Sequence, residues 1–93
     1  MRDQASSAYL VAVAARAICE VAALRSRAER EHERLATLTL QADVRFASPE
    51  AQQAFGQELT REVAWLVAKY HDDAVPDGRQ FRVFVGSYQA PTD

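Results

Sequence analysis

The chain has 93 residues, 48% of them hydrophobic and 26% charged, and this balance is typical of one small soluble domain. Its formal net charge of −2 disfavours nucleic-acid binding by this segment alone, because the chain is not basic enough to hold a phosphate backbone. Its single cysteine, Cys19, excludes a disulfide framework within the chain, and we expect Cys19 to be a small core hydrophobe in a reducing environment.

The first predicted element is a long helix over residues 1–34. This stretch has no glycine or proline and is rich in Ala, Leu, Arg and Glu, all of which favour helix. The candidates for its N-cap are Ser6, Ser7 and Asp3. One apolar stripe at helical spacing is the expected dimer interface, and it consists of Leu10, Ala14, Ala17, Val21 and Leu24.

The same helix bears on localisation. Arg16 and Glu20 interrupt its apolar run, which is therefore too short for a membrane span. Asp3 and Gln4 precede the run, so it does not fit a signal peptide. Together with the single cysteine, these features predict a cytoplasmic protein without a membrane partner.

The second predicted element is a strand over residues 36–46, ATLTLQADVRF. Every second residue from Ala36 to Phe46 is apolar, and every residue between them is polar. An alternation of period two indicates a strand with one face on a core and the other in water.

A second helix is predicted over residues 48–71. Ser48 is a suitable N-cap, Pro49 fits the first helical position, where its missing N–H costs nothing, and Glu50 meets the positive end of the helix. The helix start is therefore well defined by its residue types.

A turn at residues 76–78, Pro-Asp-Gly, leads to a last predicted strand over residues 80–88. The sequence thus predicts a single α+β domain over residues 1–93, in the order long helix, strand, helix, strand. A two-stranded ribbon is marginal in water and leaves its edges open. We therefore expect the two-stranded sheet to be completed or covered in a homodimer.

The sequence contains no recognisable catalytic or metal-binding motif. It has no Gly-rich phosphate loop and no CxxC or GxSxG pattern. His32 lies on a polar helix face without a suitable ligand one turn away, and the consecutive residues His71, Asp72 and Asp73 point in different directions. We therefore predict no enzyme activity, no cofactor and no metal site.

Four side chains outside the apolar stripes are candidates for a ligand-binding surface. They are Trp65 on the second helix and Arg82, Phe84 and Tyr88 on the last strand. Aromatic rings beside a cation suit a flat or anionic effector. The same residues would also suit packing against a partner subunit or beneath the first helix.

The motifs SPEAQQAF, VAWLVAKY and DGRQFRVFVGSYQAP, in this order, resemble the C-terminal segment of ArsR-like winged helix-turn-helix transcriptional regulators from high-GC bacteria. In that family a long helix follows the DNA-binding domain, and a strand, a Ser-x-Glu helix start and a final strand follow the helix. The similarity covers residues 37–91 and consists of capping and apolar residues. The matching positions are Ser48, Glu50, Phe55, Leu59, Leu66, Tyr70, Asp77, Gly78, Val83, Val85, Ala90 and Pro91.

The resemblance implies a C-terminal domain for dimerisation and effector binding, with DNA contacted only through a separate upstream helix-turn-helix domain. The winged helix is missing from this sequence, so we expect either an excised C-terminal domain or a stand-alone relative. The alternative function is a stand-alone protein–protein interaction module that docks through the charged stretch SRAEREHER, residues 26–34. A small dimeric α+β enzyme is a third class, for which the sequence offers no set of acid, base and nucleophile.

Overall fold

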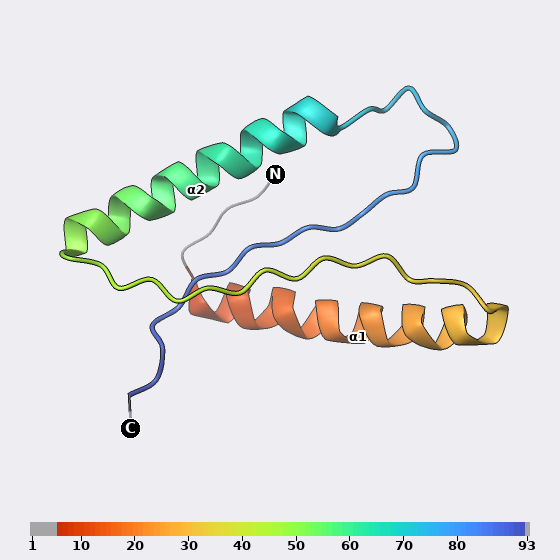
Figure 1. The fold of residues 1–93 in the computed structure, drawn as a ribbon, viewed down its shortest axis with the longest axis horizontal. Helices are drawn as coiled ribbons and strands as arrows, with labels where there is room; N and C mark the ends of the chain where they lie inside the picture. Colours follow the sequence, from red (N-terminus) through yellow and green to blue (C-terminus); the bar gives the residue numbers. More distant parts are fainter. Residues whose placement is uncertain (1–5, 93) are drawn as a thin grey trace. The chain divides into compact units, whose positions relative to one another are not determined.

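The computed structural model describes residues 6–92 and contains two α-helices (Figure 1). Helix α1 covers Ser7–Glu31, and helix α2 covers Pro49–Tyr70. The other described residues form turns and coil.

The chain divides into two compact units. Within the described chain, the α1 unit comprises residues 6–38 and 81–92, and the α2 unit comprises Thr39–Gln80. The α1 unit thus joins the long helix to the C-terminal segment. That residues 1–93 form a single domain stays a prediction.

Ser6 caps the start of α1. Its backbone is extended, and its Oγ accepts a hydrogen bond from the N–H of Tyr9 at 3.3 Å, as an N-cap side chain does. Of the three candidates, Ser6 is therefore the N-cap. The predicted first residues of the helix, and Asp3 with them, lie outside the described residues.

Helix α1 ends at Glu31, earlier than the sequence pattern predicts, because the backbone of His32 is left-handed, with φ 54° and ψ 39°. The N–H of Glu33 donates to the carbonyl of Ala28 at 2.8 Å, and the N–H of His32 donates to the carbonyl of Glu29 at 3.4 Å. This pair of bonds is the Schellman motif, which closes a helix. The polar stretch that follows is therefore not a continuation of α1.

Helix α2 begins as its residue types predict. Ser48 accepts a hydrogen bond from the N–H of Ala51 at 3.1 Å, Pro49 is the first helical residue, and Glu50 lies in the first turn. The rings of Phe46 and Phe55 then hold the entering chain against the helix, with centroids 5.2 Å apart and planes inclined by 56°. Such a tilted aromatic pair contributes about 0.5–1.5 kcal/mol beyond the area it buries.

The turn after α2 also follows its sequence. The N–H of Ala74 donates to the carboxylate of Asp72 at 2.9 Å, which makes an Asx turn. The N–H of Gly78 then donates to the carbonyl of Val75 at 3.2 Å, which closes the turn around residues 76–77.

No strand is present among residues 6–92, so the fold is all-α. The predicted strands at residues 36–46 and 80–88 are wrong, and with them the α+β class and the two-stranded sheet. Alternation tells which side chains share one side of an extended chain, whereas a strand also needs a hydrogen-bonded neighbour. Neither segment has such a neighbour in the described chain. Leu38 and Leu40, expected to face a core, are 84% and 86% exposed.

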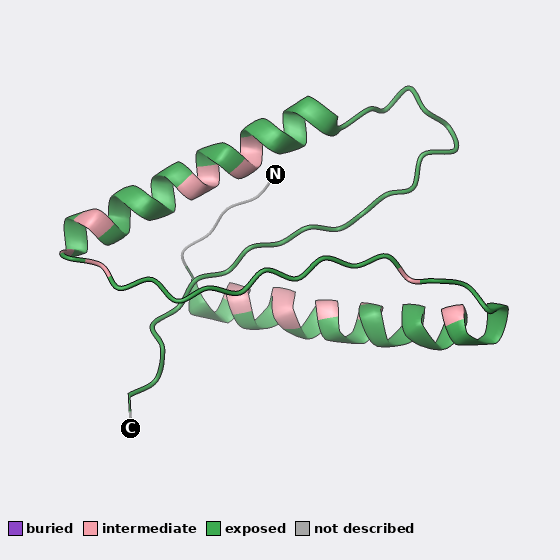
Figure 2. Cartoon of the chain, viewed as in Figure 1, coloured by how far each residue is buried: buried purple, intermediate pink, exposed green. Residues whose placement is uncertain are grey.

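None of the described residues is buried, and eighteen large hydrophobic residues are exposed. Figure 2 shows α1 and α2 in green with a few half-buried residues in pink, which on α1 follow one side of the helix. Neither helix is therefore covered all round by its own unit.

Candidate interaction surface

One apolar face of α1 lies against the C-terminal segment of the same unit. The Nε of Arg82 lies 3.0 Å from Oε1 of Glu20. A Cβ added to Gly86 would lie 2.5 Å from Cδ1 of Leu10, so a glycine there lets the backbone approach the helix closely. Because position 82 meets position 20 and position 86 meets position 10, the segment runs in the direction opposite to α1.

This face includes the predicted dimer interface. Leu10, Ala14 and Ala17 are half-buried, whereas Val21 and Leu24 are exposed. On this face, therefore, Val21 and Leu24 are the residues most open to a second molecule. The assignment of all five residues to a dimer interface stays a prediction.

A second apolar face of α1 is exposed along its whole length, and we call it the outer face. Its two large residues are Val11, which is 67% exposed, and Ile18, which is 70% exposed. Its small residues are exposed as well. The full set is Ala8, Val11, Ala15, Ile18 and Ala22.

Cys19 lies next to the outer face and is a free, exposed thiol. The expectation that it is a core residue is wrong, because an apolar helical run does not tell which of its sides faces other residues. Ile18, which precedes Cys19, belongs to the outer face, whereas Glu20, which follows it, is half-buried.

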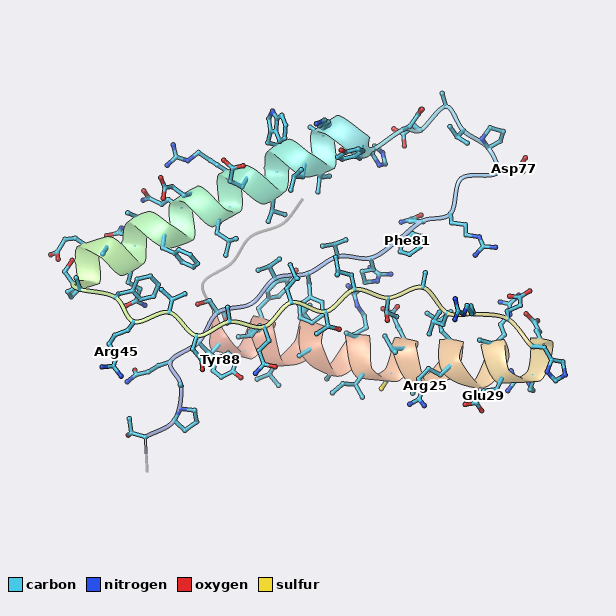
Figure 3. The ribbon with its side chains drawn as sticks, in the orientation of Figure 1. Arg25, Glu29, Arg45, Asp77, Phe81 and Tyr88 are labelled. Atoms are coloured by element: carbon cyan, nitrogen blue, oxygen red, sulfur yellow. The ribbon has the colours of Figure 1, made fainter. Side chains whose placement is uncertain are left out.

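Charged residues continue the outer face toward the end of α1. In Figure 3, Arg25 and Glu29 project from the side of the helix that faces away from Phe81 of the same unit. Near these two residues, Arg27 and Glu31 are one helical turn apart and form an ion pair, with Nε of Arg27 3.3 Å from Oε1 of Glu31. An exposed pair at this spacing stabilises a helix by about 0.3–0.5 kcal/mol.

By length and composition, α1 is apolar enough to cross a membrane, so the expectation that its apolar run is too short for a span is wrong. Signal sequences and core helices of soluble proteins share this property. Two observations weigh against a bilayer. A charged side chain such as Arg16 costs about 2.5–3.5 kcal/mol at the centre of a bilayer, and Glu20 already pairs with Arg82. That the protein is cytoplasmic and has no membrane partner stays a prediction.

The four candidate ligand-binding residues do not form a site within either unit. Trp65 lies on α2, and Nζ of Lys69 lies 4.8 Å from its ring centroid, which is a cation–π contact. Arg82, Phe84 and Tyr88 belong to the α1 unit, and both aromatic residues are exposed. The guanidinium of Arg82 contacts Glu20, so its charge is already partly matched.

The polar clusters of the α2 unit lie in solvent. A shallow depression on α2 is lined by Glu58, Arg61 and Glu62, which are all exposed. Beyond the helix, Nε2 of His71 lies 2.7 Å from Oδ1 of Asp73, and both side chains are largely exposed. Among the described residues no group of three or more His, Cys, Asp or Glu side chains is placed to hold a metal ion.

The chain was compared with protein-family models, with curated proteins and with solved structures, and none of these comparisons gives a match. The similarity to ArsR-like regulators therefore rests on the sequence motifs alone. The outer face is the surface that the sequence analysis did not single out. The sequence does contain a pattern that indicates this face, because its apolar residues are separated alternately by three and four positions.

Proposed function

We propose that this chain is a self-association domain that forms a homodimer. The observation that carries the proposal is the absence of any buried residue among residues 6–92, together with eighteen exposed large hydrophobic residues. Burial of apolar surface is the main favourable term in folding and in most protein association. Association with a second copy buries apolar surface that the single chain leaves exposed.

The biological role that we propose is the C-terminal dimerisation and effector-sensing domain of a bacterial transcriptional regulator. The motifs around Ser48 and Gly78 support this role, because they are the positions that resemble the ArsR-like family. The domain itself does not contact DNA, which agrees with its net charge of −2. The candidate effector contacts are the predicted residues Trp65, Arg82, Phe84 and Tyr88.

The proposal is tested by fusing the chain to the C-terminus of a monomeric helix-turn-helix domain. Two such domains held together bind a palindromic operator much more tightly than one does, because the second half-site is then occupied at high effective concentration. We expect the fusion to bind the palindrome at least tenfold more tightly than the DNA-binding domain alone. The same fusion on a single half-site is the control and should show no gain.

Two outcomes would speak against this function. A fusion that gains nothing on the palindrome contradicts self-association and leaves the stand-alone interaction module as the better account. A comparable gain on a single half-site would mean that the chain itself contacts DNA, which contradicts the proposal that it only dimerises and senses an effector.

A further inference from the structure

We propose that the outer face of α1 is the dimer seam, and that it pairs with the outer face of a second copy in antiparallel orientation. This inference rests on the proposed self-association, and it names the surface and the direction of pairing. The surface consists of Ala8, Val11, Ala15, Ile18 and Ala22.

The outer face has the spacing of a helix-pairing seam. From Ala8 to Ala22 its residues are separated by three, four, three and four positions. This alternation is the heptad spacing at which two helices keep one stripe in contact along their length. The predicted interface on the other face shares its helix surface with residues 82–86, whereas the outer face has no neighbour within the α1 unit.

Side-chain size favours the antiparallel direction. In a parallel pair each layer joins identical residues, so layers of two alanines would alternate with layers of two β-branched residues. In an antiparallel pair centred between residues 16 and 17, Ala15 lies opposite Ile18 of the other copy, and Val11 lies opposite Ala22. Every such layer combines one small and one large side chain, so the helices stay evenly spaced.

Charge favours the same direction. Arg25 and Glu29 continue the outer face at the same spacing (Figure 3). A parallel pair would place Arg25 opposite Arg25 and Glu29 opposite Glu29, and like charges in contact repel. The antiparallel pair separates these like charges, because Arg25 then lies level with Ala8 of the second copy and Glu29 lies beyond that Ala8.

Spin-label distances test the direction of pairing. The variant carries Cys19→Ser and Ser26→Cys, and Ser26 is an exposed residue of α1. With a rise of 1.5 Å per residue and helix axes 8–10 Å apart, the antiparallel pair separates the two labels by about 30 Å. A parallel pair would bring them to about 10–15 Å. A distance in the shorter range would overturn the antiparallel seam.

Substitution of Ile18 tests the surface. Because Ile18 is 70% exposed, Ile18→Glu removes little from the single chain, and circular dichroism should show an unchanged helix content. We expect at least a tenfold loss in dimer affinity, measured by sedimentation equilibrium. The matched control is Leu38→Glu, which places the same charge at an 84% exposed leucine of the same unit outside α1 and should leave the affinity unchanged.

The outcomes separate this inference from the proposed function. If the unsubstituted chain stays monomeric, both the proposed self-association and the outer-face seam are wrong. If the chain dimerises and the dimer tolerates Ile18→Glu, only the outer-face seam is wrong. Flotation of the chain with phosphatidylcholine vesicles, without dimers in their absence, would mean that the outer face meets lipid and would also overturn the seam.

Discussion

Replacing His32 by glycine should stabilise the protein, and the structure gives the size of the effect. His32 has a φ of 54°, which lies in the left-handed region. An L-residue with a Cβ loses about 1–2 kcal/mol there. Glycine has no such strain but loses about 0.5–1 kcal/mol more backbone entropy on folding. The net gain of His32→Gly over His32→Ala is therefore about 0.5–1 kcal/mol.

The comparison with alanine isolates the backbone effect, because both variants remove the imidazole. Urea unfolding followed by circular dichroism at 222 nm gives the free energy of unfolding of each. For a domain of this size the expected difference corresponds to about 2–8 °C in Tm. His32 makes no side-chain hydrogen bond in the described chain, so little else should change.

The sign of the difference decides where α1 ends. If the helix continued through His32 to Arg34, as the polar pattern alone predicts, glycine would lie in a helix interior. It would then be less favourable than alanine by about 0.8–1 kcal/mol. A glycine variant less stable than the alanine variant would therefore refute the Schellman ending.

Three further substitutions test the helices and their contacts. Gly56→Ala should stabilise α2 by about 0.5–1 kcal/mol, because the added Cβ meets no atom within 4 Å; a loss in urea unfolding would mean that something packs there. Ser48→Ala should cost about 1 kcal/mol, and Ser48→Asp should retain the cap; equal stability of all three proteins would refute the capping bond. A double-mutant cycle on Glu20 and Arg82 should give a favourable coupling of about 0.2–1 kcal/mol, because the pair is exposed; an unfavourable coupling would contradict the contact between the C-terminal segment and α1.

The sequence predicted the start of α2 because the signals there are local. Ser48, Pro49 and Glu50 each fit one position of a helix start for a reason that depends on the backbone alone. The end of α1 was harder to predict. Histidine is a less common left-handed residue than glycine or asparagine, so the stretch that contains His32 gives no clear stop signal.

The strands were mispredicted for a different reason. The alternation from Ala36 to Phe46 is real, but it fixes only which side chains share a side. Whether such a segment becomes a strand depends on a hydrogen-bonded neighbour elsewhere in the chain, and periodicity carries no information about that neighbour. The sequence analysis inferred a dimer partly because a two-stranded sheet leaves its edges open, and this argument is lost because the strands are absent from residues 6–92. The argument from exposed apolar faces does not depend on them.

The candidate site shows the same division between local and long-range information. The pattern of α1 predicted a stripe containing Leu10 and Ala14, and both of these residues are half-buried. It did not tell that residues 82–86 would lie on that stripe, because a contact between Gly86 and Leu10 joins distant parts of the sequence. The outer face could have been found from its heptad spacing, yet its exposure becomes evident only once the other face has a neighbour.

The solution mass of the unsubstituted chain, measured by multi-angle light scattering across micromolar concentrations, tests the central claim most directly. A single chain has a mass of 10.4 kDa. Self-association predicts a mass that approaches twice this value as the concentration rises. A folded species that remains at 10.4 kDa throughout, with its helices intact by circular dichroism, would contradict it.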